Sequence, residues 1–279
     1  MSVLQGAVLG LIQGIGEFLP VSSSAHLFLA RLLLGIGNEN AAFRVLDILL
    51  HVGTLIPILL VFWRDWIDMI AHPVRNKTLL KLFLASLPTL AFYVLLDYDV
   101  FDSGWLMGGC FLVTAVLLLL TDRLERRPGT VEPTIPQALC MGVMQGLGMV
   151  PGISRLGSTT FGGVAAGVGK KGAVKFSFMM SAPAVVASLL VEGKHALEED
   201  LFSHLEIAPC AVGVLVAAVV GFFAIRLMLK LVEKVPLSWL ALYMALLGLA
   251  YLFCQLMGLG PVPPFAAPEQ AQILRFLQP

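Results

Sequence analysis

Two copies of one motif, each placing polar side chains inside an apolar stretch, constrain this chain more than any other feature. The first copy runs from Gly10 to His26 and reads GLIQGIGEFLPVSSSAH. The second runs from Gly142 to Arg155 and reads GVMQGLGMVPGISR. When one residue is skipped, the proline and a serine of the two copies align. The duplication predicts a fold of two related halves. A site built from both copies would combine a carboxylate, a histidine and an arginine.

The composition indicates that most of the protein surface faces lipid. Hydrophobic residues make up 58% and charged residues 13% of the 279 positions, whereas soluble domains carry about 25% charged residues. The net charge is zero, so nothing indicates a nucleic-acid partner. A membrane-spanning helix needs about 20 apolar residues. Six apolar runs approach or reach that length: 45–63, 79–96, 104–121, 174–191, 207–227 and 237–258.

Four shorter, glycine-rich segments are arranged as two pairs. The segments 2–18 and 22–36 are separated by Pro20, and the segments 134–149 and 156–168 by Pro151. Such pairs predict re-entrant helix–loop–helix hairpins. Because backbone groups in lipid must be satisfied within the protein, helices are the expected form of the long runs. The predicted fold class is therefore all-α: a polytopic membrane bundle of six transmembrane helices plus two hairpins in an inverted repeat.

The charges of the loops set the expected orientation. Basic residues follow the first and third spans, precede the fourth and lie between the fifth and sixth, whereas the alternate loops are acidic. The excess of Lys and Arg in cytoplasmic loops then predicts that both termini lie outside. The chain becomes a single membrane domain with inverted halves 1–123 and 134–258 and a tail 259–279. Inverted repeats commonly place a site at the interface of the repeats.

In the first copy of the motif, Glu17 is the leading functional candidate. A carboxylate at membrane depth is costly and usually functional. Gln13 lies four residues earlier and shares a helix face with it. The pair predicts a site that holds a divalent cation or positions a proton. The alternative is that Glu17 pairs with a lysine or caps a neighbouring helix.

A helix start follows Pro20 and carries three serines and a histidine. The hydroxyls of Ser22, Ser23 and Ser24, with the free backbone N–H groups, predict a phosphate site, although a serine there also caps the helix. His26 lies one turn further on. Its closeness in sequence to Glu17 and the hydroxyls favours a catalytic role over that of a structural histidine.

The second copy repeats the break and the helix start with an arginine. A guanidinium binds phosphate oxygens in a bidentate manner, and Ser154, Ser158 and Thr159 add donors beside Arg155. The alternative is an arginine that hydrogen-bonds helix-end carbonyls. Asp47 and His51, four residues apart, either extend the site or form a local pair.

The two motifs resemble those of the undecaprenyl-diphosphate phosphatase family, the bacitracin-resistance membrane phosphatases. The first signature is matched by Gln13, Glu17, Phe18 to Ser23, and His26, and the second by Pro151, Gly152, Ser154, Arg155, Gly157 and Thr159. Two positions depart from the family pattern. Gln13 stands where many members have Glu, and Leu156 stands where Ser is usual.

The resemblance implies hydrolysis of undecaprenyl diphosphate to undecaprenyl phosphate and inorganic phosphate, which recycles the carrier lipid for cell-wall synthesis. It implies an enzyme of the bacterial plasma membrane with a site that faces outside. The expected catalytic residues are Glu17, Ser23, His26 and Arg155. The expected substrate-binding residues are Gln13, Ser22, Ser24, Ser154, Gly157, Ser158 and Thr159. Glu17 and Gln13 are expected to hold Mg²⁺ or Ca²⁺.

Several alternatives stay open at the level of sequence. The nucleophile is His26, Ser23 or water, and His26 is otherwise the general base. A flippase for the lipid phosphate would suit an inverted repeat equally well. It would have no need of an acid–base pair beside an arginine, which favours the enzyme. The expected partners are the polyprenyl diphosphate and membrane lipid, and a homodimer is kept as an alternative to the monomer.

Overall fold

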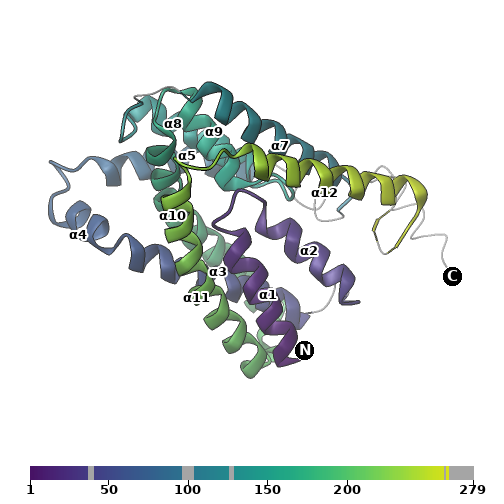
Figure 1. Ribbon diagram of the computed structural model, residues 1–279. Coiled ribbons are helices and arrows are strands. Elements are labelled where there is room, and N and C mark those ends of the chain that lie inside the picture. The colour runs from purple at the N-terminus through teal and green to yellow at the C-terminus, as the bar shows by residue number, and fades with distance from the viewer. Residues whose placement is uncertain (37–40, 96–103, 126–128, 261, 264–279) are drawn as a thin grey trace.

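The computed structural model describes residues 1–36, 41–95, 104–125, 129–260 and 262–263, and this part of the chain is helical without a named strand (Figure 1). The helices are α1 (Val3–Gly16), α2 (Ser23–Leu33), α3 (Ala41–Val61), α4 (Trp63–Ala71), α5 (Thr78–Leu95), α7 (Met107–Leu124), α8 (Ile135–Leu147), α9 (Arg155–Ala165), α10 (Lys170–Glu198), α11 (Ile207–Leu231) and α12 (Ser238–Met257), with a short 3-10 turn, η1 (Leu201–His204). The protein is a polytopic helical membrane protein, as predicted. Most of the tail 259–279 lies outside the described residues.

Five helices are long and apolar enough to cross a membrane, namely α3, α7, α10, α11 and α12. Each coincides with one of the predicted spans. The remaining predicted span, 79–96, corresponds to α5, which is 18 residues long and apolar over Thr78–Phe92. The helix α4 and the turn η1 were not predicted, because both are shorter than any span.

The predicted helix breaks at Pro20 and Pro151 are confirmed. The helix α1 ends at Gly16 and α2 begins at Ser23, whereas α8 ends at Leu147 and α9 begins at Arg155. A backbone with positive φ lies in each break, at Ser22 (φ 67°) and at Gly152 (φ 94°). Each break reverses the chain, so that α1 packs on α2 and α8 packs on α9. Their re-entrant position in a bilayer stays a prediction.

The helix contacts between the two halves form matched pairs. The helix α1 packs on α11 and α8 packs on α5, while α3 packs on α11 and α10 packs on α5. In addition, α3 contacts α10, and α7 runs beside α12 (Figure 1). Exchanging the halves therefore maps these contacts onto one another. This pattern supports the two-half arrangement, whereas the boundaries and the opposite orientation of the halves stay predictions.

Glycines allow the closest of these helix contacts. Gly10 on α1 lies against the backbone of Gly213 on α11, and Gly142 on α8 lies against the backbone of Ala85 on α5. A Cβ at either glycine would overlap the facing carbonyl oxygen. Small residues let membrane helices approach this closely.

We expect Gly142→Ala to lower the unfolding temperature in detergent. The added methyl group meets the Ala85 carbonyl, and overpacking costs about 1–3 kcal/mol. The matched control is Gly109→Ala on α7, where nothing lies within 4 Å of the added Cβ and the helix gains about 1 kcal/mol in propensity. Equal unfolding temperatures for the two variants would contradict the close approach of α5 and α8.

Ion pairs show that the basic loops gather at one end of the bundle. Three pairs join the start of α10 to α4, to the end of α7 and to the segment after α11: Lys175 with Asp65 (2.6 Å), Lys170 with Asp122 (3.1 Å) and Lys171 with Glu233 (3.0 Å). The N-terminal amine pairs instead with Glu206, before α11, at 2.7 Å. The basic loops thus share an end, as the predicted topology requires.

Candidate active site

The two copies of the motif meet through Glu17 and Arg155. The guanidinium Nη2 of Arg155 donates a hydrogen bond to Oε1 of Glu17. Glu17 is only 8% exposed, and a buried charge of this kind requires a partner. The break after α1 and the start of α9 therefore supply opposite charges to one place in the protein.

The second carboxylate oxygen of Glu17 is bound by its own copy of the motif. Oε2 accepts a hydrogen bond from the Ser23 hydroxyl at 2.7 Å and a longer one from Nε2 of Gln13 at 3.3 Å. Gln13 lies one turn before Glu17 on α1, and Ser23 is the first residue of α2. The chain reversal between the two helices thus brings a hydroxyl against a carboxylate that an arginine already holds.

His26 contacts the strained turn and not the carboxylate. Its Nδ1 lies 2.8 Å from the carbonyl oxygen of Ser22, and a carbonyl can only accept, so Nδ1 carries the hydrogen. Ser22 has φ 67°, a conformation that costs a residue other than glycine about 1–3 kcal/mol. The imidazole therefore holds the turn that positions Ser23.

Tyr243 of α12 completes the surroundings of His26. Its hydroxyl lies 2.6 Å from Nε2 of His26, and the two rings stack with centroids 5.8 Å apart. The neutral imidazole with hydrogen on Nδ1 accepts this bond. Sequence reasoning missed Tyr243. The available signal was a phenol hydroxyl in an apolar span, which needs a hydrogen-bond partner where lipid rather than water surrounds it.

A second residue that sequence reasoning missed, Thr114 of α7, fixes the loop before α9. Its hydroxyl donates to the carbonyl oxygen of Gly152 at 3.0 Å and accepts from the backbone N–H of Ser154 at 2.9 Å. The Ser154 hydroxyl in turn accepts from the backbone N–H of Gly157 at 3.1 Å and caps α9. Arg155 therefore projects from a loop whose polar groups are held in place.

Several hydroxyls predicted to bind phosphate instead contact their own segment of the chain. The hydroxyls of Ser158 and Thr159 donate to the carbonyl oxygen of Arg155 at 3.0 and 2.8 Å. The Ser24 hydroxyl lies 3.4 Å from that of Ser22. Among the described contacts, none of these hydroxyls reaches Glu17 or the guanidinium. The role of these serines and of Thr159 in binding substrate stays a prediction.

On α3, Asp47 and His51 lie on the side of the site toward α2. Asp47 forms an ion pair with Arg31 of α2, and Nδ1 of His51 donates to the carbonyl oxygen of Asp47 at 2.9 Å. His51 also lies close enough to Glu17 to interact with it electrostatically. The helix α3 thus adds one imidazole to the surroundings of the carboxylate.

The residues predicted to hold a cation fit part of a binding site. The carbonyl oxygen Oε1 of Gln13 is buried and has no hydrogen-bond partner in the described part of the chain. With Glu17 it offers the oxygen ligands that Mg²⁺ and Ca²⁺ prefer. The described residues contain no cluster of three or more His, Cys, Asp or Glu side chains suited to a metal ion. A cation here would need phosphate or water oxygens as further ligands.

Fold and site together define an integral membrane protein in which two broken helix pairs enclose a carboxylate, a hydroxyl and a guanidinium. The sequence model described as bacitracin resistance protein BacA matches residues 6–250. The undecaprenyl-diphosphatases of Carboxydothermus hydrogenoformans and Halothermothrix orenii are 34% and 37% identical to this chain. The alignments cover 92% and 89% of this chain and 99% and 96% of theirs. The chain belongs to the bacitracin resistance protein BacA family.

Proposed function

We propose that the protein hydrolyses undecaprenyl diphosphate to undecaprenyl phosphate and inorganic phosphate in the bacterial plasma membrane. The observation that carries this proposal is the contact of Arg155 and Ser23 with the two oxygens of Glu17. This contact brings together a guanidinium that can bind phosphate oxygens, a hydroxyl and a carboxylate that can act as a base. The relatives named above carry the name undecaprenyl-diphosphatase, and the product would return to cell-wall synthesis as carrier lipid.

The geometry favours Ser23 as the nucleophile. Its hydroxyl already donates to Glu17, the arrangement that activates a nucleophile through an adjacent base. Attack of Ser23 Oγ on the terminal phosphorus passes the hydroxyl proton to Glu17. The bond to the bridging oxygen breaks, and undecaprenyl phosphate leaves. Water then hydrolyses the phosphoserine and releases phosphate. Direct attack by water activated by Glu17 is the alternative.

Arg155 neutralises the charge of the phosphoryl group. Phosphoryl transfer depends mainly on positioning and on stabilisation of charge on the phosphoryl oxygens. The guanidinium has five N–H donors, and the bond from Nη2 to Glu17 uses one of them. The other donors are suited to a bidentate contact with phosphate.

We expect His26→Ala to abolish phosphate release and His26→Asn to restore much of it. Asparagine has an N–H donor that can replace the bond to the Ser22 carbonyl, but it cannot transfer a proton. Restored activity would support a positioning role for His26. If folded His26→Asn is as inactive as His26→Ala, the imidazole itself transfers the proton or attacks phosphorus.

Tyr243→Phe keeps the ring that stacks on His26 but removes the hydroxyl that donates to it. We expect this change to lower kcat by about tenfold, which corresponds to about 1.4 kcal/mol.

We propose that a divalent cation binds Glu17 and Gln13 together with the substrate diphosphate, where it would supply further positive charge. Gln13→Glu should keep or raise activity and make it more sensitive to a chelator, because two adjacent buried carboxylates favour a bound cation. The measurement is phosphate release across a titration of Mg²⁺ or Ca²⁺. The matched control is Gln145→Glu, the same change at the equivalent position of the second motif. Complete loss of cation-dependent release in Gln13→Glu alone would refute this cation site.

We also propose that the site opens to the outside of the cell. The basic loops gathered at one end place that end in the cytoplasm, and the resemblance of the two motifs to the undecaprenyl-diphosphate phosphatase family implies a site that faces the other side. With the native cysteines replaced, Ser24→Cys should react with a membrane-impermeant maleimide added to intact cells. Labelling only after the cells are broken would show that Ser24 faces the cytoplasm and would contradict this orientation.

Phosphate release from undecaprenyl diphosphate by the purified protein in detergent tests the proposed function. Detergent leaves no membrane to cross, so a flippase alone would release no phosphate under these conditions. A folded protein without release, tested with both Mg²⁺ and Ca²⁺, would contradict the proposal. One chain supplies Glu17, Ser23 and Arg155, so the proposed reaction needs no dimer.

A further inference from the structure

Helix α4 presents an apolar face that none of the helices in the described part of the chain covers. Trp63, Ile67 and Ile70 recur at the spacing of one helix face and are 52%, 57% and 72% exposed. Met69, away from that face, is fully buried. Figure 1 shows α4 standing away from the bulk of the bundle. The helix is therefore amphipathic, with its apolar side directed outward.

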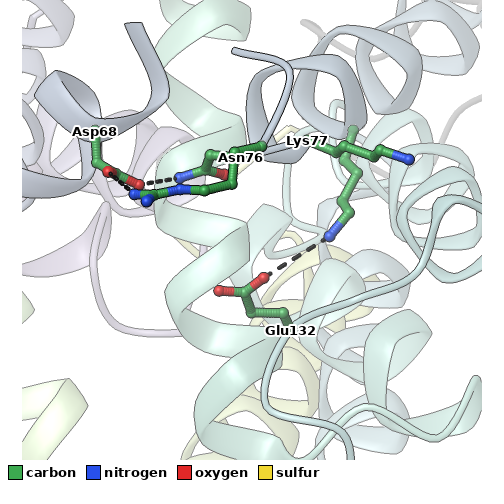
Figure 2. Close-up of a pocket in the computed structure, with 6 residues that line it drawn as sticks. Asp68, Asn76, Lys77 and Glu132 are labelled. Carbon is green, nitrogen blue, oxygen red and sulfur yellow. Dashed lines mark hydrogen bonds and ion pairs between the residues drawn. The ribbon is translucent and has the colours of Figure 1, made fainter. Parts of the chain in front are cut away.

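A polar hollow of about 350 Å³ lies where α4 leads into α5 (Figure 2). Its lining residues are Asp68, Arg75, Asn76, Lys77, Lys81 and Glu132. The lining thus contains three cationic and two anionic residues, which leaves a net positive charge. This volume is sufficient for a small polar group such as a phosphate ester.

The charges of the hollow are only partly paired. Asp68 accepts from Arg75 at 3.3 Å and from Asn76 at 2.6 Å, and Lys81 lies 3.8 Å from a largely exposed Glu132 carboxylate. Lys77 has no ion-pair partner among the described residues, and Figure 2 shows its ammonium extended away from the Asp68 group. The hollow can therefore accept an anion without first breaking a strong ion pair.

We propose that α4 lies in the membrane interface and that the hollow binds the phosphate headgroup of an anionic phospholipid. Amphipathic helices with Trp on the apolar face lie in that plane. Cationic segments beside it attract anionic lipids of the cytoplasmic leaflet. The acyl chains would continue along the exposed leucines at the start of α5, Leu79 and Leu80. A soluble anion would fill the hollow but leave the apolar face uncovered.

The site is distinct from the candidate active site, since none of its lining residues belongs to the Glu17 and Arg155 cluster. It also lies at the end of the bundle where the basic loops gather, because Asp65 of α4 pairs with Lys175 there. Binding can therefore be measured without any assay of hydrolysis, and its failure would leave the proposed function untouched.

Native mass spectrometry of the full chain in detergent, titrated with phosphatidylglycerol or phosphatidylcholine, tests the headgroup site. We expect preferential binding of phosphatidylglycerol, weakened about fivefold by Lys77→Gln and about 25-fold by the further change Arg75→Gln. The matched control is Lys194→Gln, which removes an exposed lysine from the other end of α10 and should bind as the unchanged protein does. Equal affinity for the two lipids, or an equal loss in the control, would overturn the proposal.

Two further measurements distinguish a bound phospholipid from a soluble anion in the hollow. When the other tryptophans are replaced by Phe, brominated phosphatidylglycerol in vesicles should quench the fluorescence of Trp63. The further changes Lys77→Gln and Arg75→Gln should weaken this quenching. Unquenched Trp63 in a folded protein would overturn the interfacial position of α4. Soluble glycerol phosphate should bind far more weakly than the lipid. Binding of equal strength would make the hollow a site for a small anion and exclude the lipid as its occupant.

Discussion

Replacement of Arg155 by alanine should lower phosphate release from undecaprenyl diphosphate by at least about a thousandfold. An arginine that neutralises a transferring phosphoryl group is worth about 10³–10⁵ in kcat, and Arg155 is the cation in contact with the Glu17 carboxylate. We expect the loss mainly in kcat, because charge on the phosphoryl group develops in the transition state. The measurement is steady-state phosphate release in detergent, with kcat and KM determined separately.

Arg155→Ala also leaves the buried Glu17 carboxylate without its cation. Removal of one partner from a buried ion pair costs about 3 kcal/mol or more, so unfolding temperature must be measured beside activity. Arg155→Lys keeps the charge but loses the planar donor fork, and it should fold normally with intermediate activity. The control Arg44→Ala removes an exposed arginine paired with exposed Glu199 and should change neither quantity. Full activity in folded Arg155→Ala would remove this arginine from the site.

The elements that sequence alone predicts are those set by local rules. The breaks around Pro20 and Pro151 occur as expected, but Pro57, Pro88 and Pro183 lie inside α3, α5 and α10, so a proline alone does not end a helix here. Each break also contains a residue with positive φ, Ser22 or Gly152. The long apolar runs become helices because lipid leaves the backbone no other partner. Their ends are less predictable. The helix α10 continues to Glu198 beyond the predicted end at 191, because a helix that leaves the lipid can extend into water with charged side chains.

The parts of the site that the sequence does not reveal depend on contacts between distant segments. Tyr243 reaches His26 from α12, and Thr114 reaches Gly152 from α7. Each carries a hydroxyl in an apolar span, and the neighbouring sequence does not indicate which distant residue that hydroxyl will contact. Ser158 and Thr159 show the reverse case. They are placed as phosphate donors by sequence, yet their hydroxyls bind the helix carbonyl one turn back, a bond always available to Ser and Thr.

Ser23→Ala should abolish turnover if Ser23 is the nucleophile, with a loss of about 10⁴-fold or more in kcat, as for removal of other enzymatic nucleophiles. The fold should survive, because Glu17 keeps its ion pair with Arg155 and its bond from Gln13. Ser86→Ala is the matched control, since the Ser86 hydroxyl donates to the Leu82 carbonyl of its own helix, α5. It should retain full activity.

A phosphoserine intermediate forms only if Ser23 attacks the phosphorus, so its detection distinguishes attack by Ser23 from attack by water. Substrate radiolabelled in its terminal phosphate, mixed rapidly with the protein and quenched in acid, should leave label on Ser23 of the unchanged protein and none on Ser23→Ala. If Glu17 instead activates water, the unchanged protein acquires no label and Ser23→Ala loses only the orienting hydrogen bond, a change of about tenfold in rate. Substantial turnover by folded Ser23→Ala would therefore move the attack from the serine to water, while the roles of Glu17 and Arg155 would stand.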